Sequence, residues 1–391
     1  MRNKKFLLGF LSGVLATVIL VVGIGVGVYM SMPSDTTVSD MSSKKMNLIE
    51  QVIDAYYFGK VDKNKLKEGT YKGMVEGLEE PYSTYYTKEE FKSEREETSG
   101  KYVGIGALVT KNEKNGIISI VRVFDGSPAE KAGLKKGDVI AQVEGKDVTG
   151  KDLSKVVLKI KGKENTKVTL KILDPNTMKY KTVTMVRKAV DTPSVESKMI
   201  DKKNKIGYIA IAEFDENTAT QFKQHLAKLK KQKVKGVIFD LRYNPGGLYA
   251  IVCQMLDEIL PKGTIVFTKD KNGVKEEETS DAKALNLPMA VIQNDSSASA
   301  AEIFAGAVQD FKAGTIVGTQ SYGKGVVQNI YPFSDGTALK LTIKKYYTPS
   351  GKNINNKGIT PDVKVENDGK TDKQLDAAKG VVLKDIKNKK K

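Results

Sequence analysis

Short strand-like and helix-like segments alternate between residues 206 and 318, and this alternation constrains the fold more than any other feature of the chain. It is typical of an α/β domain, in which helices cover the faces of a sheet of mostly parallel strands. The segment 234–241 is mostly apolar, as expected for a strand that is buried on both faces. We predict strands at 206–211, 234–241, 288–293 and 315–318, and helices at 217–231, 248–260 and 299–311.

The pattern changes between residues 101 and 188, where short alternating segments predict strands at 103–110, 117–123, 138–143, 167–173 and 180–186. Two motifs lie among them. YVGIG at 102–106 has two glycines that let the backbone curl and point N–H groups at one spot, so that an adjacent strand edge can capture a carboxyl terminus. SPAEKAGL at 127–134 predicts a helical turn that Ser127 caps and Gly133 ends. Each motif alone is an ordinary turn, but in this order they resemble a PDZ domain.

The segments on either side of these two regions are simpler. Apolar residues recur at helical spacing between residues 47 and 56 and again between 66 and 78, which predicts a small helical arm that packs or pairs with a partner. The charged run 94–99 is expected to be the boundary between this arm and the strand-rich region that follows. The lysine-rich end at 384–391 is expected to be a disordered, solvated tail.

Residues 6–30 contain no charged side chain. At about 1.5 Å of rise per residue, a helix of this length crosses a hydrocarbon core of about 30 Å. Arg2, Lys4 and Lys5 precede it, so the positive-inside tendency predicts that everything after Met30 lies outside the cytoplasm. A cleaved signal peptide is the alternative, but its apolar region is usually only about 7 to 15 residues long and no suitable cleavage site follows here. We therefore expect a retained single-pass anchor in the cell membrane and an extracytoplasmic remainder.

The composition is that of a globular protein. Of 391 residues, 40% are hydrophobic and 28% are charged, enough apolar mass for two or three domains. Lysines and arginines number 64 against 47 acidic residues, for a formal charge of +17. The lysines are spread through every segment and no nucleic-acid motif is present, so we expect an anionic surrounding such as a membrane or cell wall rather than nucleic acid. The lone Cys253 forms no internal disulfide and is expected to be a buried small hydrophobe.

The chain's only histidine is His225, which lies in a helix-like segment away from the serine clusters and glycine turns. A Ser-His-Asp triad therefore lacks its base, and we expect His225 to be a surface or packing residue. No HExxH motif, histidine–carboxylate cluster or Walker loop is present, so neither a metal site nor a cofactor is predicted. A lysine remains as a possible base, because burial can lower a lysine pKa from about 10.4 toward 7 or 8.

QNDSSASAAEIFAGA at 293–307 places three serines before an alanine-rich helix. Ser299 and Glu302 fit the S-x-x-E capping box, which alone explains the serine. The same position also exposes a hydroxyl beside the free amides of a helix N-terminus, such as that of Ala300, where a developing oxyanion is stabilised. From the residues alone, both interpretations of Ser299 stand.

Two further stretches bear on this chemistry. RYNPGG at 242–247 is either an ordinary turn or the source of a second oxyanion donor, at Gly246 or Gly247. In SYGKGVVQN at 321–329, Lys324 lies between two glycines. If this piece is extended, Lys324 and Gln328 share one face, so that Gln328 can hold the amine without adding a charge. Most lysines are solvated surface groups, and the residues alone do not single out Lys324.

Taken together, these motifs resemble the carboxyl-terminal processing proteases, serine peptidases of family S41 with a PDZ domain and a Ser-Lys dyad. The resemblance rests on seven motifs: GLEEPYS at 77–83, YVGIG at 102–106, SPAEKAGL at 127–134, DLRYNPGG at 240–247, SSASAAE at 296–302, YGKGVVQ at 322–328 and GITPDV at 358–363. It implies that Ser299 is the nucleophile, Lys324 the general base and Gln328 its support, with oxyanion donors at Ala300 and in the Gly246–Gly247 pair. It also implies a carboxyl-terminus-binding loop formed by Tyr102, Val103, Gly104, Ile105 and Gly106.

The expected architecture follows from the same resemblance. The fold class is α/β (α+β multidomain), with a transmembrane anchor at 1–31, a helical arm at 45–98, a PDZ domain at 99–189, a ClpP/crotonase-like S41 protease core at 190–370 and a basic tail at 371–391. One position departs from the family. Where related members have an arginine implicated in coupling substrate sensing to activation, this chain has Lys161, which keeps the charge but lacks the bidentate fork.

Two functions fit these expectations. The first is an extracytoplasmic endopeptidase that recognises unfolded proteins or exposed carboxyl-terminal tails through the PDZ domain and cleaves them. The second is a membrane-tethered binding scaffold with an inert α/β domain. A homodimer or higher oligomer and an adaptor protein are compatible partners in both cases.

Overall fold

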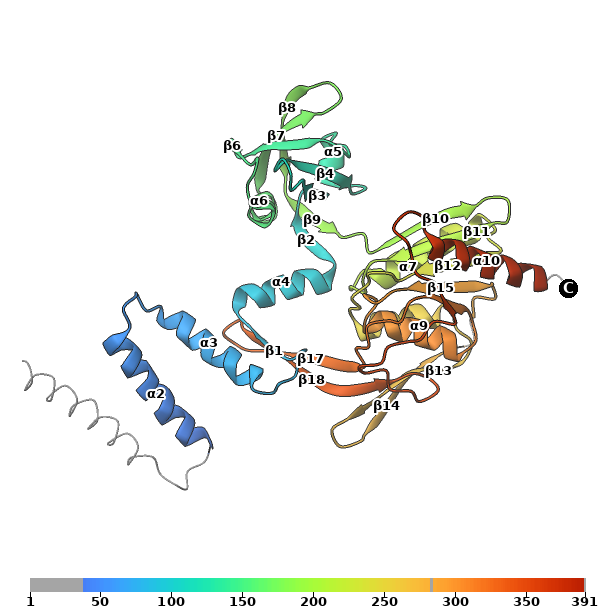
Figure 1. Ribbon diagram of the computed structural model, residues 1–391. Coiled ribbons are helices and arrows are strands. Elements are labelled where there is room, and N and C mark those ends of the chain that lie inside the picture. Colours follow the sequence, from blue (N-terminus) through green and yellow to red (C-terminus); the bar gives the residue numbers. More distant parts are fainter. Residues whose placement is uncertain (1–37, 282–283, 390–391) are drawn as a thin grey trace, which may run out of the picture. The chain divides into compact units, whose positions relative to one another are not determined.

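The computed structural model describes residues 38–281 and 284–389, which belong to two compact units divided after Tyr71 (Figure 1). The first unit contains helix α2 (Val38–Tyr56) and the start of α3 (Lys63–Glu76). These are the two helices predicted for the arm. Lys63 Nζ lies 2.9 Å from the Glu50 carboxylate and so joins the helices.

The membrane anchor predicted for residues 1–31 lies outside the described residues. None of the helices in the described part of the chain combines the length and the apolarity that crossing a bilayer requires.

An antiparallel sheet forms the domain expected to be a PDZ domain. Its strand order is β3-β4-β5-β7-β8, with β6 paired to β5. The strands are β3 (Ala107–Lys111), β4 (Ile118–Val123), β5 (Val139–Val143), β6 (Lys146–Asp147), β7 (Lys167–Asp174) and β8 (Lys179–Val186). Side chains alternate across a strand, so Val168, Leu170 and Ile172 of β7 all enter the core.

Two short helices and a ribbon complete this domain. Ser127 caps α5 (Pro128–Lys131) by accepting a hydrogen bond from the Glu130 amide, as predicted. Helix α6 (Leu153–Ile160) buries Val156 and Ile160 against the sheet. Strand β2 (Lys101–Gly104) follows helix α4 (Lys88–Ser99) and leads into the domain, and strand β9 (Lys188–Asp191) leads out of it. The two strands pair with each other.

A six-stranded sheet in the order β10-β11-β12-β15-β16-β19 is the centre of the α/β domain. Only β10 is antiparallel to its neighbour. The elements are β10 (Val195–Asp201), β11 (Ile206–Ile211), α7 (Thr218–Lys231), β12 (Gly236–Asp240), α8 (Tyr249–Asp257), β15 (Met289–Gln293), α9 (Ala300–Asp310), β16 (Thr315–Gly318) and β19 (Val363–Lys364). Val237 and Phe239 pack with α7, α8 and α9, whereas Ile238 faces the opposite side. This burial of both faces explains the apolar run predicted as a central strand.

A second sheet has the order β1-β18-β13-β14, with β17 also paired to β18. Its strands are β1 (Thr84–Tyr86), β13 (Gly263–Asp270), β14 (Lys275–Ser280), β17 (Val326–Pro332) and β18 (Ala338–Tyr347). Thr84 of β1 lies opposite Lys340 of β18. A segment that precedes the PDZ domain in sequence is therefore part of the α/β domain's second sheet.

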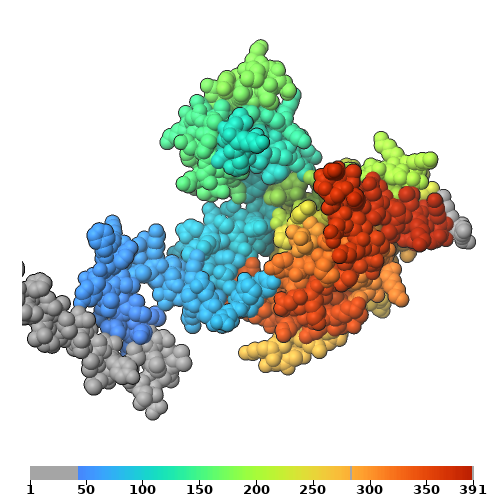
Figure 2. Space-filling view, viewed as in Figure 1, coloured from blue at the N-terminus to red at the C-terminus, as the bar shows by residue number. Residues whose placement is uncertain are grey.

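The prediction of a basic tail from residue 371, disordered from 384, is wrong for the residues that the structure describes. Residues Lys373–Asn388 form helix α10, which Asp372 caps by accepting from the Leu375 amide. Ala378, Val382 and Ile386 recur at helical spacing and pack on the face of the central sheet opposite α7, α8 and α9. Figure 2 shows α10, in dark red, seated on the surface of the α/β domain. Because lysines are interspersed with these apolar residues, the composition of the segment alone does not indicate an amphipathic helix.

Lysines occur in every segment of the chain, but two segments that the fold brings together are especially rich in them. Residues 198–205 and 228–235 together contain nine lysines and one aspartate, a formal +8 of the chain's +17. The fold brings the two segments together, because the Lys235 amide donates to the Lys205 carbonyl at 2.8 Å, and Lys198 and Lys228 line one hollow. We call residues 198–205 and 228–235 the basic turn pair.

Candidate active site

Ser299 occupies the turn between β15 and α9 with φ 54° and ψ −114°. A non-glycine residue at such angles is strained by about 1–3 kcal/mol, and the strain persists only where the surroundings hold it. Two contacts hold it here. Ser297 Oγ donates to the Leu241 carbonyl at 2.8 Å, and the Ala298 amide donates to the Asn244 carbonyl at 3.0 Å. The Ser299 side chain is thereby left partly exposed between buried neighbours.

The glycine turn after β12 approaches this serine closely. A Cβ at Gly246 would lie 2.8 Å from Ser299 Cβ, and a Cβ at Gly247 would lie 2.4 Å from the Phe214 carbonyl oxygen. The φ angles of the two glycines are 105° and 134°. Both positions therefore require glycine, for close approach as well as for backbone conformation.

The structure distinguishes between the two glycines as oxyanion donors. The Gly246 amide donates to Asn244 Oδ1 at 2.8 Å and is therefore occupied. Among the hydrogen bonds of residues 38–281 and 284–389, none has the amide of Gly247 or Ala300 as donor. The Ala300 amide belongs to the first turn of α9, where the helix dipole adds positive potential. Gly247 and Ala300 thus have the free N–H groups beside Ser299.

The carboxylate of Glu302 joins the Ser299 turn to the Lys324 loop. Its side chain is fully buried and accepts four hydrogen bonds, from the amides of Ser299 (2.8 Å), Lys324 (2.8 Å) and Gly323 (2.7 Å) and from Ser321 Oγ (2.6 Å). Burial raises the pKa of Glu302, while these four hydrogen bonds oppose the rise by stabilising the anion. The predicted reach of Glu302 back to Ser299 is present, and it is one part of a larger clamp.

Tyr346 of β18 joins the same two segments from another side. Its side chain is buried, and its hydroxyl lies 2.7 Å from the Lys324 carbonyl and 3.1 Å from the Ser299 carbonyl. Burial raises the pKa of Tyr346, so the hydroxyl keeps the proton that it donates. Glu302 and Tyr346 together fix the backbones of Ser299 and Lys324 relative to each other.

The Lys324 side chain is half-buried, and its ammonium lies 4.6 Å from the centroid of the Tyr82 ring. Burial lowers the pKa of Lys324, and the nearby Lys340 charge lowers it further, while Glu80, Glu94 and Glu302 partly oppose the shift. Within the described residues, no hydrogen bond joins the Lys324 ammonium to the Ser299 hydroxyl.

The support predicted from Gln328 differs from the observed contact. Gln328 Nε2 donates to Thr342 Oγ1 at 2.9 Å, and Thr342 Oγ1 donates to the Glu80 carboxylate at 2.8 Å. The expected hydrogen bond from Gln328 to the lysine amine is not among the contacts of the described chain. The hydrogen-bond partner of Gln328 thus lies on the neighbouring strand β18, which residue spacing within β17 does not indicate.

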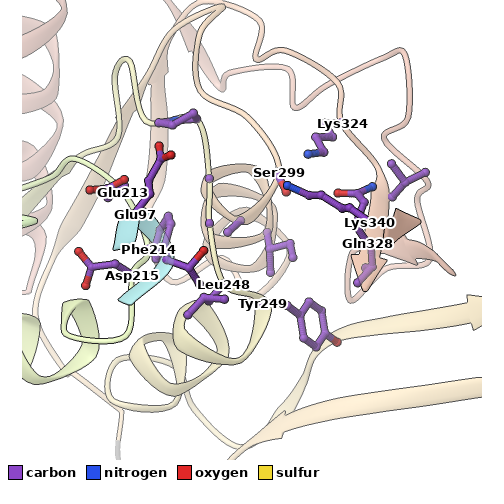
Figure 3. Close-up of a pocket in the computed structure, with 18 of the residues that line it drawn as sticks. Glu97, Glu213, Phe214, Asp215, Leu248, Tyr249, Ser299, Lys324, Gln328 and Lys340 are labelled. Carbon is purple, nitrogen blue, oxygen red and sulfur yellow. The ribbon is translucent and has the colours of Figure 1, made fainter. Parts of the chain in front are cut away.

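A cavity of about 330 Å³ is lined by all six residues predicted for the catalytic and oxyanion sites, namely Ser299, Ala300, Gly246, Gly247, Lys324 and Gln328 (Figure 3). Phe214, Leu248 and Tyr249 add apolar surface. The figure shows Glu97, Glu213 and Asp215 on one side of the view and the two lysines, Lys324 and Lys340, on the other. Burial and the neighbouring Asp215 charge raise the pKa of Glu213.

The loop predicted to bind a carboxyl terminus, Tyr102 to Gly106, connects β2 to β3, the terminal strand of its sheet. Tyr102 and Val103 pair with β9, Gly104 ends β2, and Ile105 is a core residue. Gly106 has φ 77°, and a Cβ there would lie 2.3 Å from Ser127 Cβ. The Ile105 side chain is therefore unavailable to a ligand.

Lys161, the position that departs from the family pattern, ends helix α6. Its ammonium lies 3.2 Å from Glu96 Oε2 of α4 and 4.9 Å from the centroid of the Tyr102 ring. The side chain thus bridges the predicted carboxyl-terminus loop and the helix that precedes it.

The remaining sequence expectations concern histidine, cysteine and metals. His225 Nδ1 bonds Ser197 Oγ at 2.8 Å, outside the cavity. Cys253 is a buried free thiol in the core, and burial raises its pKa to about 12. Among the described residues no cluster of His, Cys, Asp or Glu is suited to hold a metal ion.

Sequence reasoning did not identify four residues of the cavity region, namely Glu302 as a clamp, Tyr346, Lys340 and Tyr82. The S-x-x-E pattern was a visible signal for Glu302, but it is fully explained by a helix cap. Lys340 donates to Glu94 at 2.8 Å and to the Tyr86 hydroxyl at 3.2 Å. Burial alone would lower the pKa of Lys340, but the contact with Glu94 outweighs this effect, so that the pKa is raised. No local spacing links Tyr346, Lys340 or Tyr82 to Ser299.

Three family models match the chain, described as peptidase family S41 at 205–365, PDZ domain at 119–174 and activating protease CtpB N-terminal domain at 29–90. A probable CtpA-like serine protease of Staphylococcus haemolyticus is 37% identical over 375 residues, which cover 93% of this chain and 73% of the relative. One of the same description from Staphylococcus aureus is also 37% identical, over 91% of this chain and 72% of the relative.

Solved structures agree with these sequence matches. The photosystem II D1 C-terminal processing protease is 27% identical with a TM-score of 0.50, over 87% of this chain and 91% of its own. A Bacteroides fragilis chain assigned to the S41 proteases shares the fold with a TM-score of 0.54 at 16% identity, over 92% of this chain and 94% of its own. The chain therefore belongs to peptidase family S41 and is a serine peptidase of the carboxyl-terminal processing type with a PDZ domain.

Proposed function

We propose that the protein is an endopeptidase in which Ser299 is the nucleophile and Lys324 the general base. The observation that carries this proposal is the arrangement within one cavity of a strained, partly exposed serine, a half-buried lysine with a lowered pKa and two free amides. A neutral lysine is a competent base near neutral pH, and free amides stabilise an oxyanion.

The reaction follows from these roles. The neutral Lys324 amine takes the Ser299 proton while Oγ forms a bond to the scissile carbonyl carbon, and the amides of Ala300 and Gly247 stabilise the oxyanion. The C–N bond then breaks as the Lys324 ammonium returns the proton to the leaving amine. Water attacks the acyl-enzyme ester with Lys324 again as base, which releases the new carboxyl terminus and restores Ser299.

The test is cleavage of an unfolded protein such as casein by the full chain. Ser299→Ala and Lys324→Ala should each abolish cleavage while the thermal unfolding transition is retained. Ser296→Ala is the matched control, because Ser296 is an exposed residue of the same turn. Undiminished cleavage by either site variant would refute the dyad. Inactivity of the wild type on every substrate, with retained binding of carboxyl-terminal peptides, would favour the binding scaffold.

We further propose that the loop at 102–106 and the edge of β3 bind the carboxyl terminus of an unfolded substrate. The support is a terminal strand beside glycine amides, the arrangement that binds peptides by strand addition. A peptide with a free carboxyl terminus should compete with casein cleavage or stimulate it, whereas the amidated peptide should do neither. Equal effects of both peptides would contradict a carboxylate site.

We propose that the protein is anchored by residues 6–30 and acts outside the cytoplasm. The uncharged stretch with basic residues before it supports the anchor, and the basic turn pair supports an anionic surrounding. In intact cells of an expression host, an added protease should digest the α/β domain, and carbonate should not extract the full chain from membranes. Complete protection in intact cells would contradict the orientation.

The exposed apolar stripe on α2 supports a homodimer. Ile49, Val52 and Tyr56 are spaced at i, i+3 and i+7 and are 49%, 49% and 72% exposed. Crosslinking of the full chain in detergent should give a dimer that Val52→Glu weakens. Sedimentation as a monomer before and after the substitution would contradict this assignment. An adaptor protein remains compatible with the same stripe.

A further inference from the structure

Tyr82 provides the surface against which the Lys324 ammonium lies. The nitrogen is 4.6 Å from the ring centroid, well inside the roughly 6 Å limit for a cation–π contact. Tyr82 comes from the segment between α3 and β1, far in sequence from Ser299 and Lys324. The base candidate therefore contacts a side chain that no motif around Ser299 or Lys324 indicates.

The backbone on both sides of Tyr82 is fixed. Glu80 accepts hydrogen bonds from Ser83 Oγ at 2.6 Å and from Thr342 Oγ1 at 2.8 Å, and the Thr342 amide donates to Ser83 Oγ at 3.1 Å. Thr84 then begins β1 opposite Lys340. The ring is also part of the site's polar network, because burial and a hydrogen bond with Tyr322 raise the pKa of Tyr82 to about 12. The ring consequently has a defined place beside Lys324.

A ring face attracts an ammonium ion much more strongly than a neutral amine, because the attraction is between a charge and the ring quadrupole. The contact therefore favours the charged form of Lys324, and it opposes the effects of burial and of the Lys340 charge. The titratable and charged groups that face Lys324 come from several elements: Glu80 and Tyr82 before β1, Glu94 of α4, Glu302 of α9, Tyr322 before β17, and Lys340 and Tyr346 of β18. Of these groups, Tyr82 is the one whose ring face meets the ammonium.

We propose that Tyr82 is a positioning residue that holds Lys324 in its protonated form over the ring, away from a hydrogen bond to Ser299, and releases it when the amine loses its proton. The catalytic consequence rests on the proposed role of Lys324 as base. In that case Tyr82 sets the pH at which the site becomes active, and the segment before the PDZ domain supplies this control.

The experiment measures the Lys324 pKa directly, without reference to catalysis. The full chain is labelled at trace level with isotopic acetic anhydride across a pH series, and the labelling of Lys324 is followed by peptide mass mapping. The variants are Tyr82→Leu, which removes the ring, and Tyr82→Phe, which keeps it. Replacement of Tyr82 by mono-, di- and trifluorophenylalanine weakens the ring quadrupole stepwise at nearly constant shape. Labelling of Lys340, which faces Tyr86 and Glu94, is the internal control.

The expected result is that Tyr82→Leu lowers the Lys324 midpoint by about 0.4–1.5 pH units, from the usual strength of a cation–π contact. The fluorinated rings should give graded decreases relative to Tyr82→Phe, and the Lys340 midpoint should not move. A Lys324 midpoint that is constant or rises along the fluorinated series would overturn the proposal, even if Tyr82→Leu fails to fold.

The pH profile of kcat/KM on a peptide substrate separates this proposal from the dyad. If Lys324 is the base, the acid limb of the profile moves to lower pH together with the labelling midpoint. A labelling shift with an unmoved acid limb would refute Lys324 as the base and leave the Tyr82 contact supported. An acid limb that moves while the labelling midpoint of Lys324 is constant would refute the Tyr82 proposal.

Discussion

Replacement of Glu302 with glutamine tests whether one buried carboxylate holds the nucleophile and the base candidate together. The ionised side chain accepts hydrogen bonds from three backbone amides and from Ser321 Oγ, two at each oxygen. Glutamine has a single carbonyl oxygen, and its NH₂ group would face two N–H or O–H donors. Two of the four donors therefore lose their acceptor, whichever way the amide is oriented.

The cost can be estimated from these lost contacts. A buried donor without an acceptor costs about 1–3 kcal/mol, so two of them lower the free energy of unfolding by about 2–6 kcal/mol. The effect on catalysis should exceed the effect on substrate binding, because the amides of Ser299 and Lys324 are among the donors. We expect kcat to fall with little change in KM.

Urea unfolding of the wild type and Glu302→Gln measures the first effect. The chain has no tryptophan, so near-ultraviolet circular dichroism of the tyrosines is the signal. Steady-state peptide cleavage measures the second effect. Glu302→Asp is the control for charge, since it keeps the carboxylate but is too short to reach both loops. A glutamine variant with wild-type stability and kcat would refute the four-acceptor interpretation and indicate that Glu302 is protonated in the folded protein.

Four further predictions follow from the same geometry. Since only the neutral amine accepts a proton, kcat/KM should rise with pH through the lowered pKa of Lys324; a profile that is flat into the acidic range would exclude a lysine base. Tyr346→Phe removes the donor shared by two carbonyls and should lower the free energy of unfolding by about 1–3 kcal/mol in urea titrations, and an unchanged midpoint would contradict this role. Gly246→Ala places a Cβ 2.8 Å from Ser299 Cβ, so a folded variant with strongly reduced peptide cleavage is expected, and full activity would be inconsistent with the close approach. Truncation before α10 uncovers the apolar side chains of the central sheet that α10 covers, such as Ile238 and Ile292, and should give a chain that binds a hydrophobic dye; dye binding equal to that of the wild type would argue against this core role of α10.

Local patterns were sufficient for most of the secondary structure. Strand β12 was predictable because both of its faces are buried, which leaves a mostly apolar run in the sequence. The cap at Ser127 was predictable because its donor, the Glu130 amide, is three residues away. Helix α10 was missed because its apolar stripe is diluted by lysines, and it is recognisable only once the opposite face of the sheet is known to need a cover.

In the active site too, some features could be predicted from the sequence and others could not. The resemblance to the carboxyl-terminal processing proteases led to Ser299, Lys324 and the glycine turn, and the structure brings these residues to one cavity. The hydrogen bond predicted between Gln328 and Lys324 is not among the contacts of the described residues, where Gln328 Nε2 donates to Thr342 of the neighbouring strand. Spacing along one strand determines which residues share a face, but it carries no information about what lies on the strand beside it.

The family, the order of the domains and the residue types available for catalysis could be read from the sequence, because the family motifs are local and the chain has a single histidine, which lies away from them. The three-dimensional contacts were needed to show that Gly247 rather than Gly246 has a free amide, that Glu302 and Tyr346 fix the two loops, and that Tyr82 faces the Lys324 ammonium. The contacts of Glu302 and Tyr346 with Lys324 join residues 22 positions apart, and Tyr82 is still farther from Lys324 in sequence. Hydrogen bonds and cation–π contacts depend on distances of a few ångströms between such residues, which no spacing along the chain specifies.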